Sequence, residues 1–560
     1  MAGFTDQFER RVIPRWHDSQ DGVLHKESMS LRAAASSFAP DTQVIREELE
    51  RTRSPGVAVD ALNVGIAAGD QAIAELAARI IDEHRSGLPV PVTEMADRVL
   101  GRPTNELPIL MPFLQRHGSS IHKLRRLLRV YPRSPLLHLD LARHLVTIGH
   151  SEKAKKPIAA AMTLAPNNRT ILRATARFLA NAGKTDEAYR LIRDAPVTKH
   201  DPWLIAAEIA LSQLVERDPH HWRAGRDFLE RAAVAPIHLS ELATAVGTVE
   251  LLSGNKKQAR KFFSQGLSHA TENSLAQIRC AERRTGTIMV GEGMATTPER
   301  TRAFEAEFLR HYNSADMVKA AECGQYWVDS EPFSATPASA MAHVAGLLDD
   351  YDTAERFASL GLIAHPDEPS LQNNFVYAHI SSGKIFDAPT PEAIEHNVRN
   401  LVRTLRTYIE KGGWDGVHAM ANLGLLAFRI GQVDDGKLLY ERTIQLAQKA
   451  QQPQQAATAA VFFAREALLA GVPWASTVLE SAQKLAKPFA TNPGNAPSVG
   501  FYLRKIEALA KDPDRAGHIL SVRSADEFLP VKSKRPQVSL KVARKPDGRL
   551  IVWVPPSSAR

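Results

Sequence analysis

A spacing of 34 residues between small side chains constrains this chain more than any single motif does. Ala142 and Ala176 are one such spacing apart, and so are Ala154 and Ala188. Small side chains let two antiparallel helices approach closely, and a glycine between them, such as Gly149, lets the chain turn. The pattern therefore predicts helix–turn–helix units that stack on one another.

The same internal spacing recurs along most of the chain. Further units begin at Ser240, Thr301, Ala335, Pro369, Val417 and Ala457. Prolines such as Pro166, Pro332 and Pro366 follow the second helices and stop them. An alanine-rich helix can match one such unit by chance, but so many units in matching phase exclude chance. The sequence therefore predicts an extended helical array in place of one compact core.

The positions of these residues resemble the tetratricopeptide repeat (TPR) family. The resemblance implies an all-α fold, a TPR-like α-α superhelical solenoid whose function is protein binding. We therefore expect a non-enzymatic scaffold or adaptor that mediates protein–protein interaction in the cytoplasm through a concave groove.

The resemblance also implies where a partner binds, because TPR grooves are lined mainly by the first helix of each unit. The polar residues on these rows, and hence the expected partner contacts, are Arg143, Arg173, Arg177, Asn181, Asn373, Tyr377, Arg429 and Arg465. Apolar residues such as Leu139 and Leu425 lie on the same rows. Arginines and amides over an apolar floor suit a peptide that bears carboxylates. We expect protein partners that use acidic or amphipathic segments.

Changes of pattern along the chain predict six regions. They are an N-terminal helical cap (1–54), a first TPR-like array (55–285), a glycine-containing break or hinge (286–298), a second TPR-like array (299–490), a capping helix and linker (491–531) and a basic β-hairpin tail (532–560). Within the second array, Pro391–Lys411 is predicted to be an extended second helix.

The last region changes from helical to strand periodicity. Apolar and polar residues alternate before a turn at Asp547-Gly548, and a second apolar run follows it, which is typical of a β-hairpin over Val538–Val554. The apolar surface is expected to include Leu540, Val542, Ile551 and Trp553. Because an isolated hairpin is marginally stable, we expect it to pack near Phe501 and Leu503 or to present an edge to a partner strand.

Charge is concentrated in this tail. Residues 532–560 hold eight basic residues against Asp547, so the tail carries +7 of the net charge of +8. A second basic stretch covers Lys123–Arg133 on a predicted helix. The alternative function is therefore nucleic-acid binding through residues 532–560, although only Trp553 is available there for base stacking.

The sequence lacks the most specific motifs for catalysis and cofactor binding, and matches to shorter patterns, Ser120-x-x-Lys123 and Arg79 with His84, are typical of chance. It contains no glycine-rich phosphate loop, no His-Glu-x-x-His and no Cys-x-x-Cys. We expect no catalytic residue, cofactor or metal site, and an enzyme with an unrecognised site between repeats is the second alternative. Two cysteines, Cys280 and Cys323, indicate a reducing compartment, and no apolar run is long enough to predict a membrane span.

Overall fold

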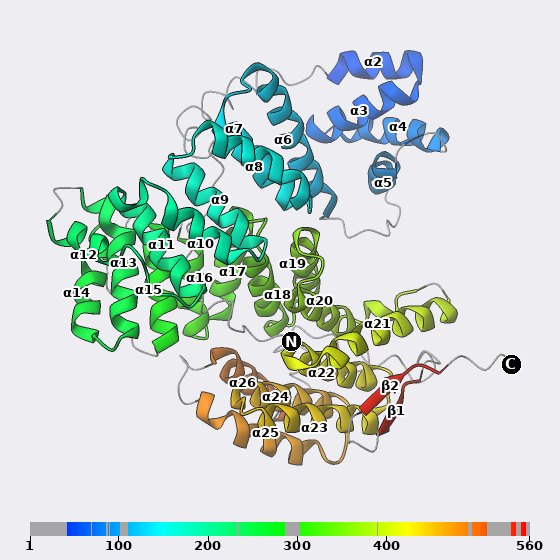
Figure 1. Ribbon diagram of the computed structural model, residues 1–560. Helices are drawn as coiled ribbons and strands as arrows, with labels where there is room; N and C mark the ends of the chain where they lie inside the picture. The colour runs from blue at the N-terminus through cyan, green and yellow to red at the C-terminus, as the bar shows by residue number, and fades with distance from the viewer. Residues whose placement is uncertain are drawn as a thin grey trace. The chain divides into compact units, whose positions relative to one another are not determined.

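The computed structural model shows a chain made mainly of helices (Figure 1). It describes residues 42–68, 70–85, 88, 90–100, 110–231, 235–285, 303–388, 390–490, 496–511, 539–544 and 550–555. The described residues up to Pro132 form one compact unit, and those from Arg133 onward form a second one. This division lies inside the predicted first array. The predicted break at 286–298 and most of the predicted cap (1–54) lie outside the described residues, so these boundaries stay predictions.

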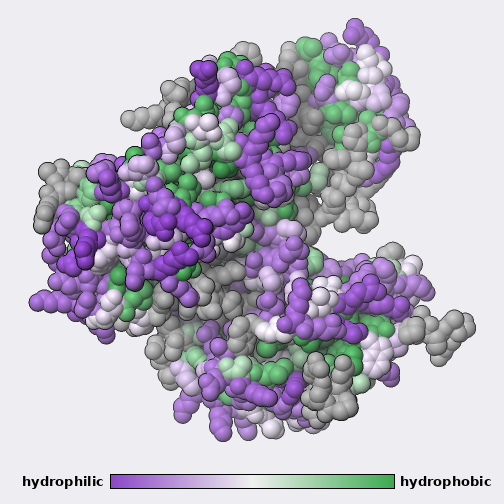
Figure 2. All heavy atoms as spheres, in the orientation of Figure 1, coloured by the Kyte–Doolittle hydropathy of each residue, from purple (hydrophilic) through white to green (hydrophobic). Residues whose placement is uncertain are grey.

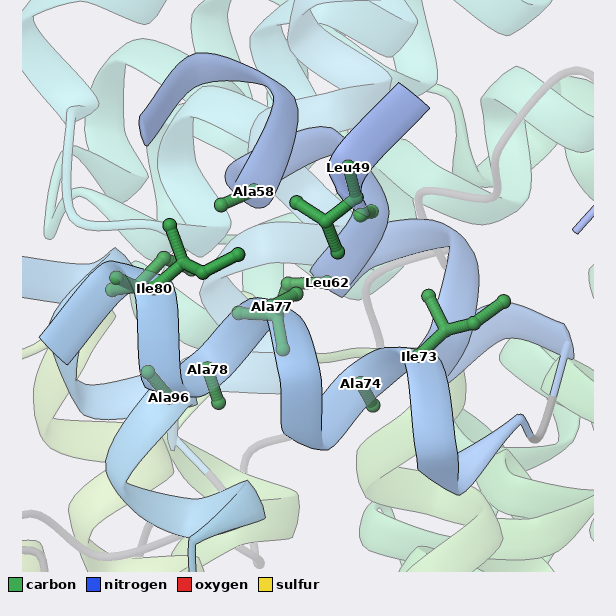
Figure 3. Packing of buried hydrophobic residues seen from close by; sticks show 11 residues of the cluster. Leu49, Ala58, Leu62, Ile73, Ala74, Ala77, Ala78, Ile80 and Ala96 are labelled. Carbon is green, nitrogen blue, oxygen red and sulfur yellow. The ribbon is translucent and has the colours of Figure 1, made fainter. Parts of the chain in front are cut away.

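The described residues of the first unit form five helices. They are α2 (Thr42–Thr52), α3 (Pro55–Ala68), α4 (Gln71–Glu83), α5 (Val90–Val99) and α6 (Leu110–Val130). Alanines and branched aliphatic residues from α2 to α5 share one core, in which Leu49, Leu62 and Ile80 are almost fully buried (Figure 3). Asp70 caps α4 by accepting a hydrogen bond from the backbone N–H of Ile73 at 3.2 Å.

The basic stretch of α6 divides into two faces. Ile121 and Leu124 are buried, while the cationic side chains Lys123, Arg125, Arg126 and Arg129 are exposed. The helix is therefore amphipathic, as its pattern predicts.

The second unit is built from consecutive helix pairs. They are α7 (Pro135–Thr147) with α8 (Ser151–Leu164), α9 (Arg169–Asn181) with α10 (Thr185–Asp194), α11 (Pro202–Leu214) with α12 (Trp222–Arg231), α13 (Pro236–Leu252) with α14 (Lys256–Leu267), α16 (Phe304–Asn313) with α17 (Met317–Ser330), α18 (Ala335–Leu347) with α19 (Tyr351–Ala364), α22 (Gly413–Arg429) with α23 (Val433–Lys449), and α24 (Pro453–Leu469) with α25 (Ala475–Ala490). Between these pairs, α20 (Pro369–Ser381) packs on α19 and α22, whereas the extended helix α21 (Pro391–Lys411) packs on α22. Also present are α15 (Glu272–Thr285), α26 (Pro497–Lys511) and the short 3₁₀ helices η2 (Thr198–His200) and η4 (Lys384–Phe386).

The tight turns between paired helices require a residue whose backbone has a positive φ, the left-handed conformation. Gly149 (φ +77°) and Gly183 (φ +74°) take this conformation at the positions that the repeat predicts, because glycine has no Cβ to clash there. Asp349 takes the same role between α18 and α19 with φ 60°. An aspartate tolerates this region better than most residues, and its carboxylate then enters the interior, as described below.

Small residues lie where the paired helices meet. Ala142, Ala154, Ala176, Ala188 and Ala354 are all buried, which confirms the predicted register. First helices also pack on the next first helices, as α11 does on α13 and α18 does on α20. The described parts of the two predicted arrays join where α15 packs on α16. The fold is thus all-α, with TPR-like stacked helix pairs and one small sheet.

The small sheet is the predicted C-terminal hairpin. Strands β1 (Lys541–Arg544) and β2 (Leu550–Trp553) are antiparallel, and Val542 lies opposite Val552. The predicted turn at Asp547-Gly548 lies outside the described residues.

Presentation of an edge to a partner strand stays a prediction, but packing near Phe501 and Leu503 was wrong for the hairpin. It packs on α21, and the side-chain amide of Gln432 bonds the backbone of Leu540, donating to its carbonyl at 2.9 Å and accepting from its N–H. The expected apolar face was also partly wrong, since Leu540, Leu550 and Val552 are buried whereas Trp553 is exposed. Because side chains alternate along a strand, Leu550 and Val552 lie on the face opposite to Trp553. The hairpin packs on the helix with the face that carries Leu550 and Val552.

None of the helices within the described ranges is both long and apolar enough to cross a membrane.

Replacing Ala176 by leucine tests the close packing. Ala176 is 1% exposed beside Leu172, Ala188 and Tyr189, so the extra carbons have no room. We expect Ala176→Leu to lower the free energy of unfolding by about 1–3 kcal/mol in urea denaturation followed by circular dichroism. Ala159→Leu is the matched control, because Ala159 is exposed on α8. Equal unfolding curves for the two variants would contradict the observed register.

Candidate functional site

The eight residues predicted to contact a partner all lie on first helices. Arg143 is on α7, three residues are on α9, two are on α20, and Arg429 and Arg465 are on α22 and α24. The structure does not place them on one continuous open surface. It distributes most of them among three separate contacts within the second unit.

The first contact joins α7 and α9 to the corner between α17 and α18. Arg143 donates a hydrogen bond to the Ser330 carbonyl at 3.0 Å, and Arg177 pairs with Glu331 at 3.4 Å. Both guanidinium groups also lie 5.9 Å from the centre of the Phe333 ring, one contact each. Cations over an aromatic face are stabilised by its quadrupole. These two arginines therefore recognise a carboxylate and an aromatic ring supplied by the same chain.

A buried hydrogen bond holds the corner in place. The indole N–H of Trp327 donates to the Glu331 carboxylate at 3.1 Å, and both residues are almost fully buried. Because two donors satisfy this carboxylate, the cost of removing it from water is offset.

The second contact runs across the helices α9, α11, α13 and α15, each of which packs on the next. Arg173 pairs with Glu241 at 2.6 Å, and the Asn273 amide donates to the other oxygen of Glu241 at 2.8 Å. The Arg173 guanidinium lies 5.1 Å from the ring centre of Trp203, and that of Arg169 lies 5.7 Å from it. We call Arg169, Arg173, Trp203, Glu241 and Asn273 the first-helix face.

The third contact is a buried polar cluster around Arg465. Its guanidinium donates to the Tyr377 hydroxyl at 3.0 Å and to the Tyr351 hydroxyl, and it pairs with Glu466 at 3.2 Å. Glu466 also pairs with Arg429. The predicted residues Tyr377, Arg429 and Arg465 are therefore brought together, but inside the protein.

Asp349 extends this cluster to the capping helix. Its carboxylate accepts hydrogen bonds from the hydroxyls of Tyr351 at 2.7 Å and Tyr502 at 3.1 Å, and from the Lys505 ammonium at 2.6 Å. Burial raises the pKa of Tyr351 and of Tyr502 well above the ordinary value, so both hydroxyls keep their protons. Burial lowers the pKa of Lys505, an effect that the Asp349 charge opposes. The cluster thus joins α19, α20, α24 and α26 through charge-assisted hydrogen bonds.

Asn373 lies beside the cluster on α20. Its side-chain oxygen accepts a hydrogen bond from the Asn422 amide of α22 at 3.3 Å. On α22, His418 is buried and contacts the Gln455 side chain at 3.3 Å. Burial lowers the pKa of His418 to about 4, so the imidazole is neutral near pH 7.

Burial separates the predicted partner residues into two classes. Arg143, Arg177, Asn373, Tyr377, Arg429 and Arg465 are buried. Arg173 and Asn181 are half-buried on α9. Partner binding by any of these side chains stays a prediction, and the geometry offers Arg173 and Asn181 to a partner most directly.

The structure describes residues 539–544 and 550–555 of the basic tail. Lys541 is exposed on β1, while most of the other basic residues of 532–560 lie outside the described ranges. Nucleic-acid binding by the tail stays a prediction.

The described residues give little geometric support for a metal site or a reactive thiol. Among them, no group of three or more histidine, cysteine, aspartate or glutamate side chains is arranged to hold a metal ion. Cys280 is buried and Cys323 is half-buried, and burial raises the pKa of the Cys323 thiol, which disfavours the reactive thiolate.

The acidic partners of the predicted arginines were missed by sequence reasoning. Glu466 directly follows Arg465 on an otherwise apolar helix, which was a usable signal. Asp349 stands where the repeat places a turn glycine, which was another. Glu331 and Glu241 carry no such signal, because they lie 154 and 68 residues from the arginines that they contact.

Comparison with known proteins adds little to this geometry. No protein-family model matches the chain, and no curated protein matches it. Among solved structures, the crystal structure of yeast Tom70 aligns with 73% of this chain and 96% of its own at 14% identity, with a TM-score of 0.26. Because that score is low, the fold assignment rests on the helix pairs and their packing.

Removing the Arg465 charge tests the buried cluster. Methionine approximates the length of arginine but leaves Asp349 and Glu466 with fewer donors. We expect Arg465→Met to lower the free energy of unfolding by about 3–5 kcal/mol, the usual cost of an uncompensated buried charge. Urea denaturation measures this change. Arg504→Met on α26 is the control because Arg504 is exposed, and the same loss in both variants would exclude a special role for the cluster.

His418 makes stability depend on pH. Its folded pKa of about 4 lies below the ordinary value of 6.5, so the unfolded chain binds a proton first on acidification. The contribution of neutral His418 to the free energy of unfolding is complete above pH 6.5. It is lost as the pH falls toward 4, by up to roughly 3 kcal/mol. His418→Gln should therefore lose less stability than the wild type between pH 7.5 and 4.5 in thermal unfolding. Parallel curves for the two proteins would contradict this assignment.

Proposed function

We propose that this protein is a non-enzymatic helical-repeat scaffold that binds one or more protein partners. The observation that carries the proposal is the stacking of α9, α11, α13 and α15, which brings Arg173, Trp203, Glu241 and Asn273 together, one from each helix. Stacked repeats create an extended surface whose residues come from many units, and such surfaces suit proteins better than small substrates.

The first-helix face is the proposed binding surface. Tryptophan and arginine are the residues that most often carry binding energy at interfaces, because each combines a large contact area with polar donors. Trp203 and Arg173 are half-buried, so they are held in place yet still reachable. Asn181 lies at the C-terminal end of α9, and a partner that follows this helix reaches it as well.

The chemistry of the face suggests an acidic or amphipathic segment as the ligand. Arg173 already holds one carboxylate, that of Glu241, at 2.6 Å. At the corner, Arg177 and Phe333 show that the same row of α9 accommodates a carboxylate beside an aromatic ring. A partner carboxylate can extend this arrangement by pairing with Arg169, which is exposed beside the Trp203 ring. A cytoplasmic location is part of the proposal and rests on the scarcity of cysteine.

Capture of partners by the immobilised full chain tests this proposal. We expect at least one protein to be retained in stoichiometric amount by the wild type. Arg173→Gln combined with Trp203→Leu should reduce its retention at least tenfold, because both anchors are lost while hydrogen bonding to Glu241 and apolar packing are kept. Mass spectrometry and quantitative gel staining measure retention.

Arg190→Gln is the matched control, since Arg190 is exposed on α10, outside the first-helix rows. It should retain the partner as the wild type does. Equal retention by the double variant would exclude the first-helix face. A wild-type protein that captures nothing in stoichiometric amount would contradict the scaffold function.

A further inference from the structure

A cavity of about 520 Å³ lies between α21, α22, α23 and β2. Its walls are mostly apolar and include Ile409, Met420, Leu439, Leu446 and Ile551. Its volume falls in the range of small-molecule sites, which are concave, largely apolar and carry few polar groups. In Figure 2, hydrophobic residues appear between hydrophilic ones where Figure 1 places α21, α22 and the hairpin.

Two local features, a glycine turn and a set of hydrogen bonds, hold the walls of the cavity apart. Gly412 (φ +75°) and Gly413 (φ +67°) separate α21 from α22, and a Cβ at either position would meet nothing within 4 Å. Left-handed backbone at these glycines turns the chain without filling the space beside it. On the other side, Gln432 holds Leu540, and Arg399 donates to the Pro555 carbonyl at 3.3 Å. These contacts anchor both ends of the hairpin, so β2 forms a wall.

The charges at the cavity are not balanced. Arg406 is paired with Glu410 at 3.5 Å, and both residues line the cavity. Arg442 of α23 also lines it, is half-buried, and has no carboxylate partner within the described ranges. A guanidinium beside apolar walls is an attractive position for one negative charge, because the low dielectric strengthens the ion pair.

We propose that this cavity binds a small amphipathic anion, namely an apolar chain that ends in a single carboxylate. The chain would contact Met420, Leu446 and the β2 wall, and the carboxylate would pair with Arg442. The site is separate from the first-helix face, and its occupancy does not depend on the scaffold function. Because the hairpin supplies one wall, a bound ligand also stabilises the docking of residues 550–553.

Titration calorimetry of the full chain with decanoate, below its micelle concentration, tests the proposal. We expect one decanoate to bind per chain. Arg442→Gln should weaken binding about tenfold, because one charge-assisted hydrogen bond is lost. The uncharged analogue 1-decanol should bind the wild type and Arg442→Gln equally. This difference between the two probes separates charge recognition from simple apolar partition.

Two further variants locate the site. Leu446→Trp should prevent binding of both probes, because Leu446 is half-buried on the cavity wall and a larger side chain fills the space. Arg403→Gln, an exposed position on α21 that does not line the cavity, should bind as the wild type does. Urea unfolding of each variant verifies that it is folded. Absence of decanoate binding, or binding that neither Arg442→Gln nor Leu446→Trp changes, would overturn the proposal.

Discussion

Close approach between antiparallel helices is the constraint on which the second unit depends. A Cβ added at Gly247 would lie 2.8 Å from the Phe263 ring, and one at Gly424 would lie 2.8 Å from the Tyr440 ring. Such contacts leave no space for a larger residue, so glycine and alanine determine how closely the pairs pack. Dispersion attraction grows with this proximity, and each pair can then bury its apolar face against its neighbours alone.

Buried charge adds specificity to this apolar packing. Arg465 pairs with Glu466 at 3.2 Å and lies 3.9 Å from the Asp349 carboxylate, and such directional contacts require a defined placement of the helices that carry them. Asp349 reaches the interior because it occupies a turn position that glycine takes elsewhere. The same residue therefore turns the chain, orients three partners and attaches the capping helix α26. Glu331 joins distant elements in the same way, because its ion pair with Arg177 attaches the corner between α17 and α18 to α9.

These internal contacts remove most of the predicted partner residues from the surface of the first helices. Arginines that face a groove in an open repeat array are used here to join distant repeats, and only the first-helix face keeps Arg173 and Trp203 within reach of a partner. The hairpin at the other end of the chain encloses a different kind of space, which is mostly apolar and is lined by Arg442, a cation without a carboxylate partner among the described residues. An extended polar face and a small apolar cavity differ in shape and chemistry, which is why we propose different ligands for them.

The sequence by itself determined the local elements of this protein. Alanine at positions such as Ala142 and Ala176, glycine at Gly149 and Gly183, and strand alternation before Trp553 predicted the helix pairs, their turns and the hairpin, because each depends on neighbours within one repeat. Only the tertiary structure decided which carboxylates meet the arginines and where the hairpin packs. Arg177 and Glu331 are 154 residues apart, and Gln432 and Leu540 are 108 apart. Small rotations between successive repeats accumulate over such distances, and a periodic pattern carries no information about their sum.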